Sequence, residues 1–154
     1  MAKVQKFLRI FFDIVLWRRG PQDLPASVLL LAVTVAAYVA VSIVQLALLD
    51  EPASSWLFFL LVDPLLLGAW IWLLLKLYGK SERFLQAASA VFGTGAVLGL
   101  ALYLPLQLIV TAIGAAPTSG IAQVSGLPVL VTFALVAGRI FKLATDSNLF
   151  TGMA

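Results

Sequence analysis

Long apolar runs dominate the chain from residue 27 onward, and short breaks rich in Gly, Pro or charged residues separate them. A helix needs about 20 residues to cross a hydrocarbon core of ~30 Å. Four runs meet this length: 27–49, 56–78, 84–113 and 121–143. The pattern predicts an all-α polytopic membrane protein with about four transmembrane helices, in a domain that covers residues 21–154.

The third and fourth runs have less certain boundaries than the first two. As one straight helix, 84–113 would be about 45 Å long, which is more than the membrane needs. Pro105 lacks a backbone N–H, so it should kink or end that helix. The small polar segment 114–126 predicts a loop, either outside the membrane or partly embedded. The fourth helix then begins at Ile121 or at Leu127, and the tail Ala144–Ala154 should fray.

Residues 1–20 show a helical alternation of a different kind. Basic and acidic residues recur every three or four positions, which places them on one face: Lys3, Lys6, Arg9 and Asp13. Bulky apolar residues occupy the other face: Val4, Phe7, Leu8, Phe11, Ile14 and Val15. This predicts an amphipathic helix in the lipid headgroup region, anchored by Trp17 and ended by Gly20-Pro21. A cleaved signal peptide is the alternative, but Arg9 and Asp13 interrupt the apolar stretch and no small-residue cleavage site follows.

Composition agrees with a membrane location. The 154 residues are 62% hydrophobic and 11% charged, whereas a soluble domain carries about 25% charged residues. The chain has no cysteine and no histidine. These absences exclude disulfides, thiol nucleophiles, Cys/His metal sites and His-based acid–base catalysis. We therefore expect no catalytic residue, no metal ligand and no cofactor.

The basic residues segregate to one side of the predicted bundle. All ten fall in three clusters: Lys3, Lys6, Arg9, Arg18 and Arg19; Lys76, Lys80 and Arg83; Arg139 and Lys142. With four spans, these clusters share a side, and the opposite loops, 50–55 and 114–126, contain no Lys or Arg. The positive-inside rule makes both termini cytoplasmic, at the plasma membrane if the source is bacterial. The N-terminal cluster should contact anionic headgroups rather than nucleic acid.

Asp63 is the one acidic residue well inside a span, about 10 Å below the outer surface. A charge at that depth is costly, and such groups usually face a bundle interior or a polar cavity. Asp63 is thus either a titrating or ion-contacting group, or a docking point for a partner helix. Alternatively it is a hydrogen-bonded carboxyl beside the kink at Pro64. A third possibility is that the span begins only after Pro64.

A polar stripe accompanies this carboxyl. Steps of four, four and three residues put four polar side chains on one face of the first span: Thr34, Tyr38, Ser42 and Gln45. By depth, a polar cluster in the outer half of the membrane should unite Asp63, Ser42, Gln45, Gln107 and Thr132. Such a cluster serves either as interhelical hydrogen-bonding contacts or as a substrate site.

The third span carries a small-residue motif, Gly95-x-x-x-Gly99. Motifs of this kind permit close approach of two helices. Packing within the subunit and packing between subunits both remain open.

One short segment carries a family resemblance. The turn Arg19-Gly20-Pro21-Gln22-Asp23-Leu24-Pro25 lies just before the first span, and closely spaced helices follow it. This layout resembles the Yip1-like group of small polytopic membrane proteins, although that group usually has five spans and a longer polar N-terminal region. The resemblance implies a non-enzymatic, membrane-organising or partner-binding role and assigns no functional residue.

Two functions follow from these patterns. Small size, short loops and the lack of catalytic groups favour an accessory or scaffold subunit that binds another membrane protein or a second copy of itself. Asp63 and the polar stripe favour a small oligomeric transporter or channel. A membrane enzyme fits less well, because the paired acid–base or metal-ligand groups that catalysis needs are missing.

Overall fold

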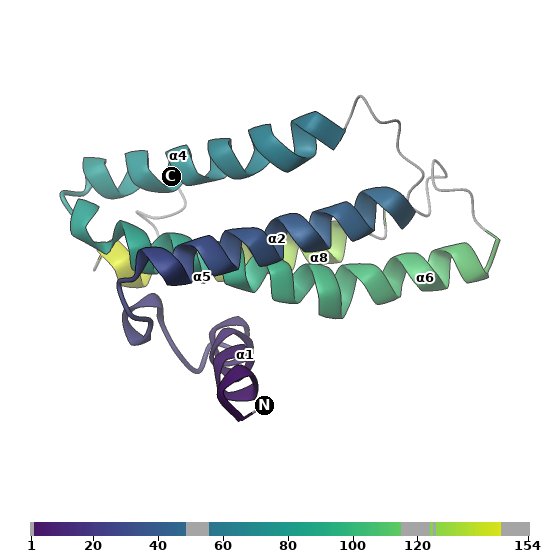
Figure 1. Cartoon of the computed structure of the whole chain (residues 1–154), viewed down its shortest axis with the longest axis horizontal. Coiled ribbons are helices and arrows are strands. Elements are labelled where there is room, and N and C mark those ends of the chain that lie inside the picture. The colour runs from purple at the N-terminus through teal and green to yellow at the C-terminus, as the bar shows by residue number, and fades with distance from the viewer. Residues whose placement is uncertain (1, 49–55, 115–123, 125, 146–154) are drawn as a thin grey trace.

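The computed structural model describes residues 2–48, 56–114, 124 and 126–145 of the chain (Figure 1). Its α-helices are α1 (Ala2–Val15), α2 (Val28–Leu48), α4 (Asp63–Leu77), α5 (Phe84–Leu98), α6 (Leu104–Ala112) and α8 (Leu127–Thr145). Within the described residues there is no strand. Four helical stretches are long and apolar enough to cross a membrane: Val28–Leu48, Leu60–Leu77, Ser81–Ala112 and Leu127–Thr145. The prediction of an all-α polytopic membrane protein is confirmed.

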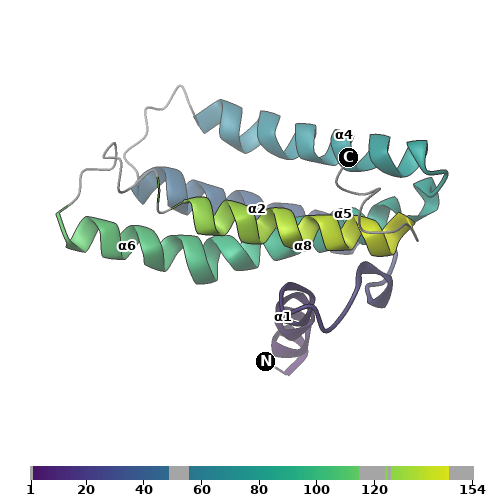
Figure 2. The same ribbon diagram turned by 180° about the vertical axis from the view of Figure 1, so that it is seen from behind.

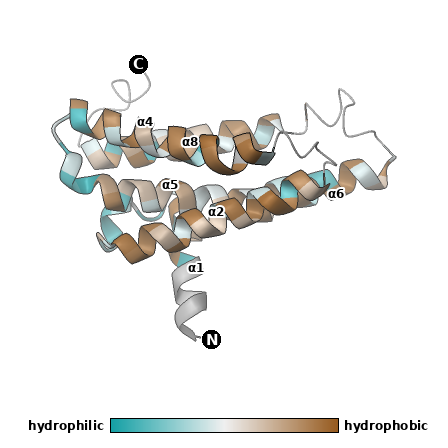
Figure 3. Cartoon of the chain, turned by 45° about the horizontal axis from the view of Figure 1, so that its top comes forward, coloured by the Kyte–Doolittle hydropathy of each residue, from teal (hydrophilic) through white to brown (hydrophobic). Residues whose placement is uncertain are grey.

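The spanning helices run along a common direction, and α1 lies across them (Figures 1 and 2). In both views α4 lies on one side of α2 and α1 lies on the other. We call the end where α2 and α5 begin and where α4 and α8 end the basic end; the opposite end is the far end. Hydrophilic residues gather at the basic end, whereas the helices themselves are mostly hydrophobic (Figure 3).

In two spanning helices, a turn just before a proline contains one extra residue. Short π-helical turns, η2 (Phe58–Val62) and η4 (Gly99–Tyr103), precede α4 and α6. In each, an amide donates to the carbonyl five residues earlier, Asp63 to Phe58 and Leu104 to Gly99. Pro64 and Pro105 follow; each lacks an N–H, and its ring opposes the carbonyl four residues back. The wider turn accommodates that ring while the helix continues.

The helix is continuous from Trp56 to Leu77. The possibility that the second span begins only after Pro64 is therefore excluded. The 84–113 run also stays helical past Pro105, as far as Ala112. Helix α8 runs from Leu127 to Thr145, and the other starting point considered for it, Ile121, lies outside the described residues. The loop 50–55, most of 114–126 and the tail beyond 145 lie outside the described residues.

Helix α5 occupies the centre of the molecule. Its residues from Ala87 to Leu98 are buried with the exception of half-buried Gly95, and α1, α2, α4 and α8 all contact it. Small side chains on several sides make this possible, because neighbouring backbones can approach closely. Gly95 faces Tyr38 of α2 and Phe133 of α8, and Gly99 faces Val41 and Gln45 of α2. Both glycines of the motif thus pack against helices of the same chain.

Helix α1 packs part of its apolar face on protein. Phe11 and Ile14 are only 3% and 2% exposed, and the Phe11 ring lies where a side chain on Gly93 would be. Phe12 and Leu16, by contrast, are exposed. The side chains of Lys3 and Lys6 lie outside the described residues.

A C-terminal cap ends α1 earlier than Gly20-Pro21. The amide of Arg18 donates to the Asp13 carbonyl and the amide of Trp17 to that of Ile14, at 2.8 and 3.1 Å. Trp17 adopts φ of 64°, the left-handed conformation that this capping motif requires and that glycine usually supplies.

Candidate functional site

Asp63 forms a direct hydrogen bond between two spanning helices. The Tyr38 hydroxyl of α2 donates a hydrogen bond of 2.7 Å to Asp63 Oδ2 at the start of α4. Asp63 is the first residue after the π turn η2, and Tyr38 is long enough to reach it from the neighbouring helix. The bond therefore joins α4 to the rest of the bundle in the half nearer the far end.

The Tyr38 ring is held from two sides. It meets the Phe92 ring of α5 edge to face, with centroids 5.5 Å apart and planes at 71°, an arrangement that aromatic pairs favour. It also lies against Gly95, where a Cβ would approach Tyr38 Cε2 to 3.0 Å. The absence of a side chain at Gly95 thus makes room for this ring, and the ring contacts orient the hydroxyl toward Asp63.

The other residues of the predicted polar cluster are placed differently. Ser42 Oγ donates to the Tyr38 carbonyl at 3.0 Å, and Thr132 Oγ1 donates to the Pro128 carbonyl at 2.7 Å. Both hydroxyls are thus satisfied by their own helices, as is common for Ser and Thr. Gln107 is buried, and Gln45 lies over Gly99. The sequence placed Tyr38 on the polar stripe but gave no reason to single it out as the partner of Asp63.

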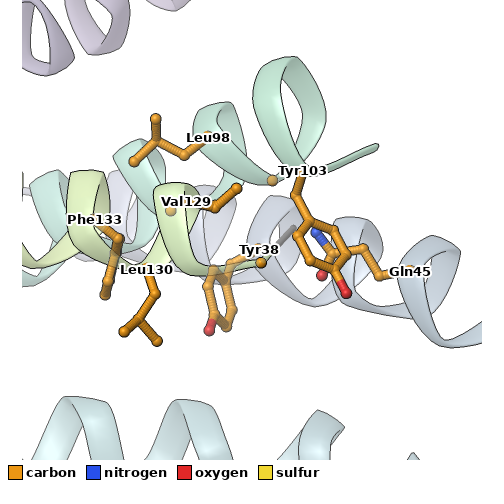
Figure 4. Close-up of a pocket in the computed structure, with 10 residues that line it drawn as sticks. Tyr38, Gln45, Leu98, Tyr103, Val129, Leu130 and Phe133 are labelled. Atoms are coloured by element: carbon orange, nitrogen blue, oxygen red, sulfur yellow. The ribbon is translucent and has the colours of Figure 1, made fainter. Parts of the chain in front are cut away.

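A pocket of about 230 Å³ lies beside this pair (Figure 4). Its walls come from α2, α5, η4, α8 and the residue before α8. Ten residues line it: Tyr38, Gln45, Gly95, Leu98, Gly99, Tyr103, Gly126, Val129, Leu130 and Phe133. Most of this lining is apolar, and its side-chain polar groups are two phenols and one amide, so it can accept an apolar group with a few hydrogen-bonding atoms.

The basic end has a separate set of contacts. The Arg139 guanidinium lies 5.1 Å from the centre of the Trp17 ring, so it interacts with the end of α1. Lys76 lies 4.5 Å from the Trp72 ring, and Arg19 pairs with Asp13 at 3.5 Å. Arg83 donates to the Ala144 carbonyl at 3.0 Å and thereby caps the last turn of α8. The basic side chains at this end thus contact residues near the ends of α1, α4 and α8. Arg9, Arg18 and Arg19 are exposed.

No three His, Cys, Asp or Glu side chains gather into a possible metal site in the part of the chain that the structure describes. Comparison with protein-family models, with curated proteins and with solved structures finds no match to this chain. Its function is therefore inferred from its own geometry.

Proposed function

We propose that this integral membrane protein is a non-enzymatic accessory or scaffold subunit that acts by binding another membrane protein or a second copy of itself. The central position of α5 carries the proposal. Since α5 fills the space between the other helices, a single copy has no room there for a conduit. The outward faces of the helices, among them those of α2, α4 and α8, remain available for binding. The resemblance in layout to Yip1-like proteins supports the same role.

The outward face of α2 suits a partner helix best. Its exposed residues include a row of alanines one turn apart: Ala32, Ala36 and Ala40. Small residues let helices pack closely within lipid. The exposed face of α4 instead carries the large side chains of Leu65, Leu66 and Trp70.

Purification in mild detergent, followed by identification of what copurifies and by mass measurement, tests this function. We expect a stoichiometric protein partner or a homo-oligomer. Ala40→Leu should weaken that association, while Ala69→Leu, on the exposed face of α4, should leave it intact. A monomer without a protein partner in both detergent and lipid nanodiscs would overturn the proposal.

A small oligomeric transporter is the second candidate, and the Tyr38–Asp63 bond beside the 230 Å³ pocket favours it. If Asp63 titrates during transport, Asp63→Asn should assemble normally and lose flux in reconstituted vesicles. Equal flux in Asp63→Asn and the unmodified protein would eliminate this role for Asp63.

A further inference from the structure

The pocket beside Tyr38 lies inside the span, well away from the basic end. Along α2, Gln45 and Tyr38 are three and ten residues before Leu48, or about 5 and 15 Å from that end of the helix at 1.5 Å per residue. The pocket therefore extends roughly 10 Å through the half of the membrane nearer the far end.

Polar and apolar groups occupy opposite ends of this pocket. In Figure 4, Gln45 and Tyr103 are drawn toward one end of the pocket, and Leu98 and Phe133 toward the other. The Gln45 amide fits there because Gly99 has no side chain; a Cβ at Gly99 would come within 2.8 Å of Gln45 Nε2. The lining thus matches a ligand that is polar at the end nearer the membrane surface and apolar below it.

The size of the pocket restricts the occupant to a slender group. A helix with its side chains is 10–12 Å across, which a volume of about 230 Å³ cannot contain. An apolar cavity of about 150 Å³ is known to hold benzene. The remaining abundant candidate in this part of the membrane is a hydrocarbon chain.

We propose that the pocket binds one acyl chain of a phospholipid from the leaflet at the far end. The ester carbonyl of that chain accepts a hydrogen bond from the Gln45 amide, whose NH₂ is a donor. The methylenes below it lie along Leu98 and Val129 toward Phe133. The Tyr38 hydroxyl already donates to Asp63, so Tyr38 presents its apolar ring to the chain. This inference goes beyond the proposed function and is independent of any protein partner.

Photolabelling of the full chain in vesicles tests this site. The vesicles contain phosphatidylcholine and phosphatidylglycerol with a small fraction of phosphatidylcholine that carries a diazirine in one acyl chain. Leu98 is only 6% exposed and lines the pocket, Leu65 is 71% exposed on α4, and Val91 is fully buried away from the pocket. We expect adducts on Leu98 and on Leu65 and none on Val91, because bulk lipid reaches Leu65 and only a chain inside the pocket reaches Leu98.

A variant in which a larger side chain fills the pocket tests whether the Leu98 adducts depend on the pocket. Val129→Trp places a large side chain in the pocket and should remove most Leu98 adducts while the Leu65 adducts persist. Val131→Trp, on the exposed face of the same helix, should keep both. Leu130→Trp repeats the test at a second lining residue if Val129→Trp loses its helical content or elutes as an aggregate.

Three results would overturn the proposal. The first is labelling of Leu65 without Leu98 in the unmodified protein. The second is Leu98 labelling that survives in a folded pocket-filling variant. The third is displacement of the Leu98 adduct by excess palmitic acid but not by excess unlabelled phosphatidylcholine, which would assign the pocket to a free fatty acid.

Discussion

Gly93 decides how closely α1 approaches the bundle. A Cβ at this position would overlap the Phe11 ring, which is itself buried. Because Gly93 has no side chain, the surface of α5 has a notch there, which the Phe11 ring occupies. A methyl group added at Gly93 would therefore have to displace this packed ring.

We predict that Gly93→Ala lowers the free energy of unfolding by about 1–3 kcal/mol, the usual cost of overpacking. Phe11→Leu in the same chain should recover part of the loss, because the shorter side chain vacates the notch. Gly68→Ala is the control, since nothing lies within 4 Å of a Cβ there. Unfolding in mixed detergent micelles measures all three, and equal stability of the Gly93 and Gly68 variants would refute the packing.

The Tyr38–Asp63 bond is the second residue-scale contact that can be tested. Tyr38→Phe and Asp63→Leu each remove one partner, and interhelical bonds of this kind contribute about 0.6–2 kcal/mol. The double variant should therefore lose less stability than the sum of the two single losses. Asp63→Asn retains an acceptor and should be close to neutral. Ser42→Ala is the control, because the Ser42 hydroxyl bonds its own helix; additive losses would show that the two residues do not interact.

Residue number is sufficient to find the position of these residues along each helix, at 1.5 Å per residue. It does not predict their direction around the helix. The π turn before Asp63 adds one residue to the turn, which changes the direction of every side chain after it relative to the preceding helix. This is one reason why residues grouped by depth alone have different partners: Asp63 bonds Tyr38, whereas the hydroxyls of Ser42 and Thr132 bond their own helices.

At the scale of elements, helix α1 has one apolar surface that is buried against the bundle and one that is exposed. Phe11 and Ile14 pack on the bundle, whereas Phe12 and Leu16 are exposed beside them. The sequence predicted one apolar face toward lipid. It could not show that part of this face would be covered by α5, because that requires the notch at Gly93 to lie opposite Phe11.

Spin labels on α1 distinguish these surfaces. We expect a label at residue 12 or 16 to be mobile and accessible to oxygen dissolved in lipid, and a label at residue 14 to be immobilised and shielded from oxygen and from water-soluble nickel reagents. A label at residue 9 should contact the water-soluble reagent, as Arg9 is exposed. Equal mobility at residues 12 and 14 would mean that α1 is not docked on α5.

Proline positions made the two interrupted helices partly predictable. A kink or an end was expected at Pro105, and a kink at Pro64. The structure shows that both helices continue through a π turn. A proline requires a local change in the helix but does not determine whether the helix kinks, ends or forms a widened turn. Both helices form a π turn, and α2 packs against η2 and η4.

At the scale of the molecule, hydropathy predicted four helices long and apolar enough to cross a membrane, as the structure shows. Each run of apolar residues must satisfy its backbone internally within lipid, so helix length follows directly from run length. The central place of α5 did not follow in the same way. Its small residues showed that close packing occurs, while only the structure shows that the partners are four helices of the same chain.

Membrane topology tests the four-span bundle most directly, because four spans and one-sided basic clusters require each other. Reporter fusions at residues 1, 52, 80, 118 and 154 place each connection on one side of the membrane. We predict cytoplasmic signals at 1, 80 and 154 and external signals at 52 and 118, as the positive-inside rule requires. An external signal at position 80 would contradict the four-span bundle.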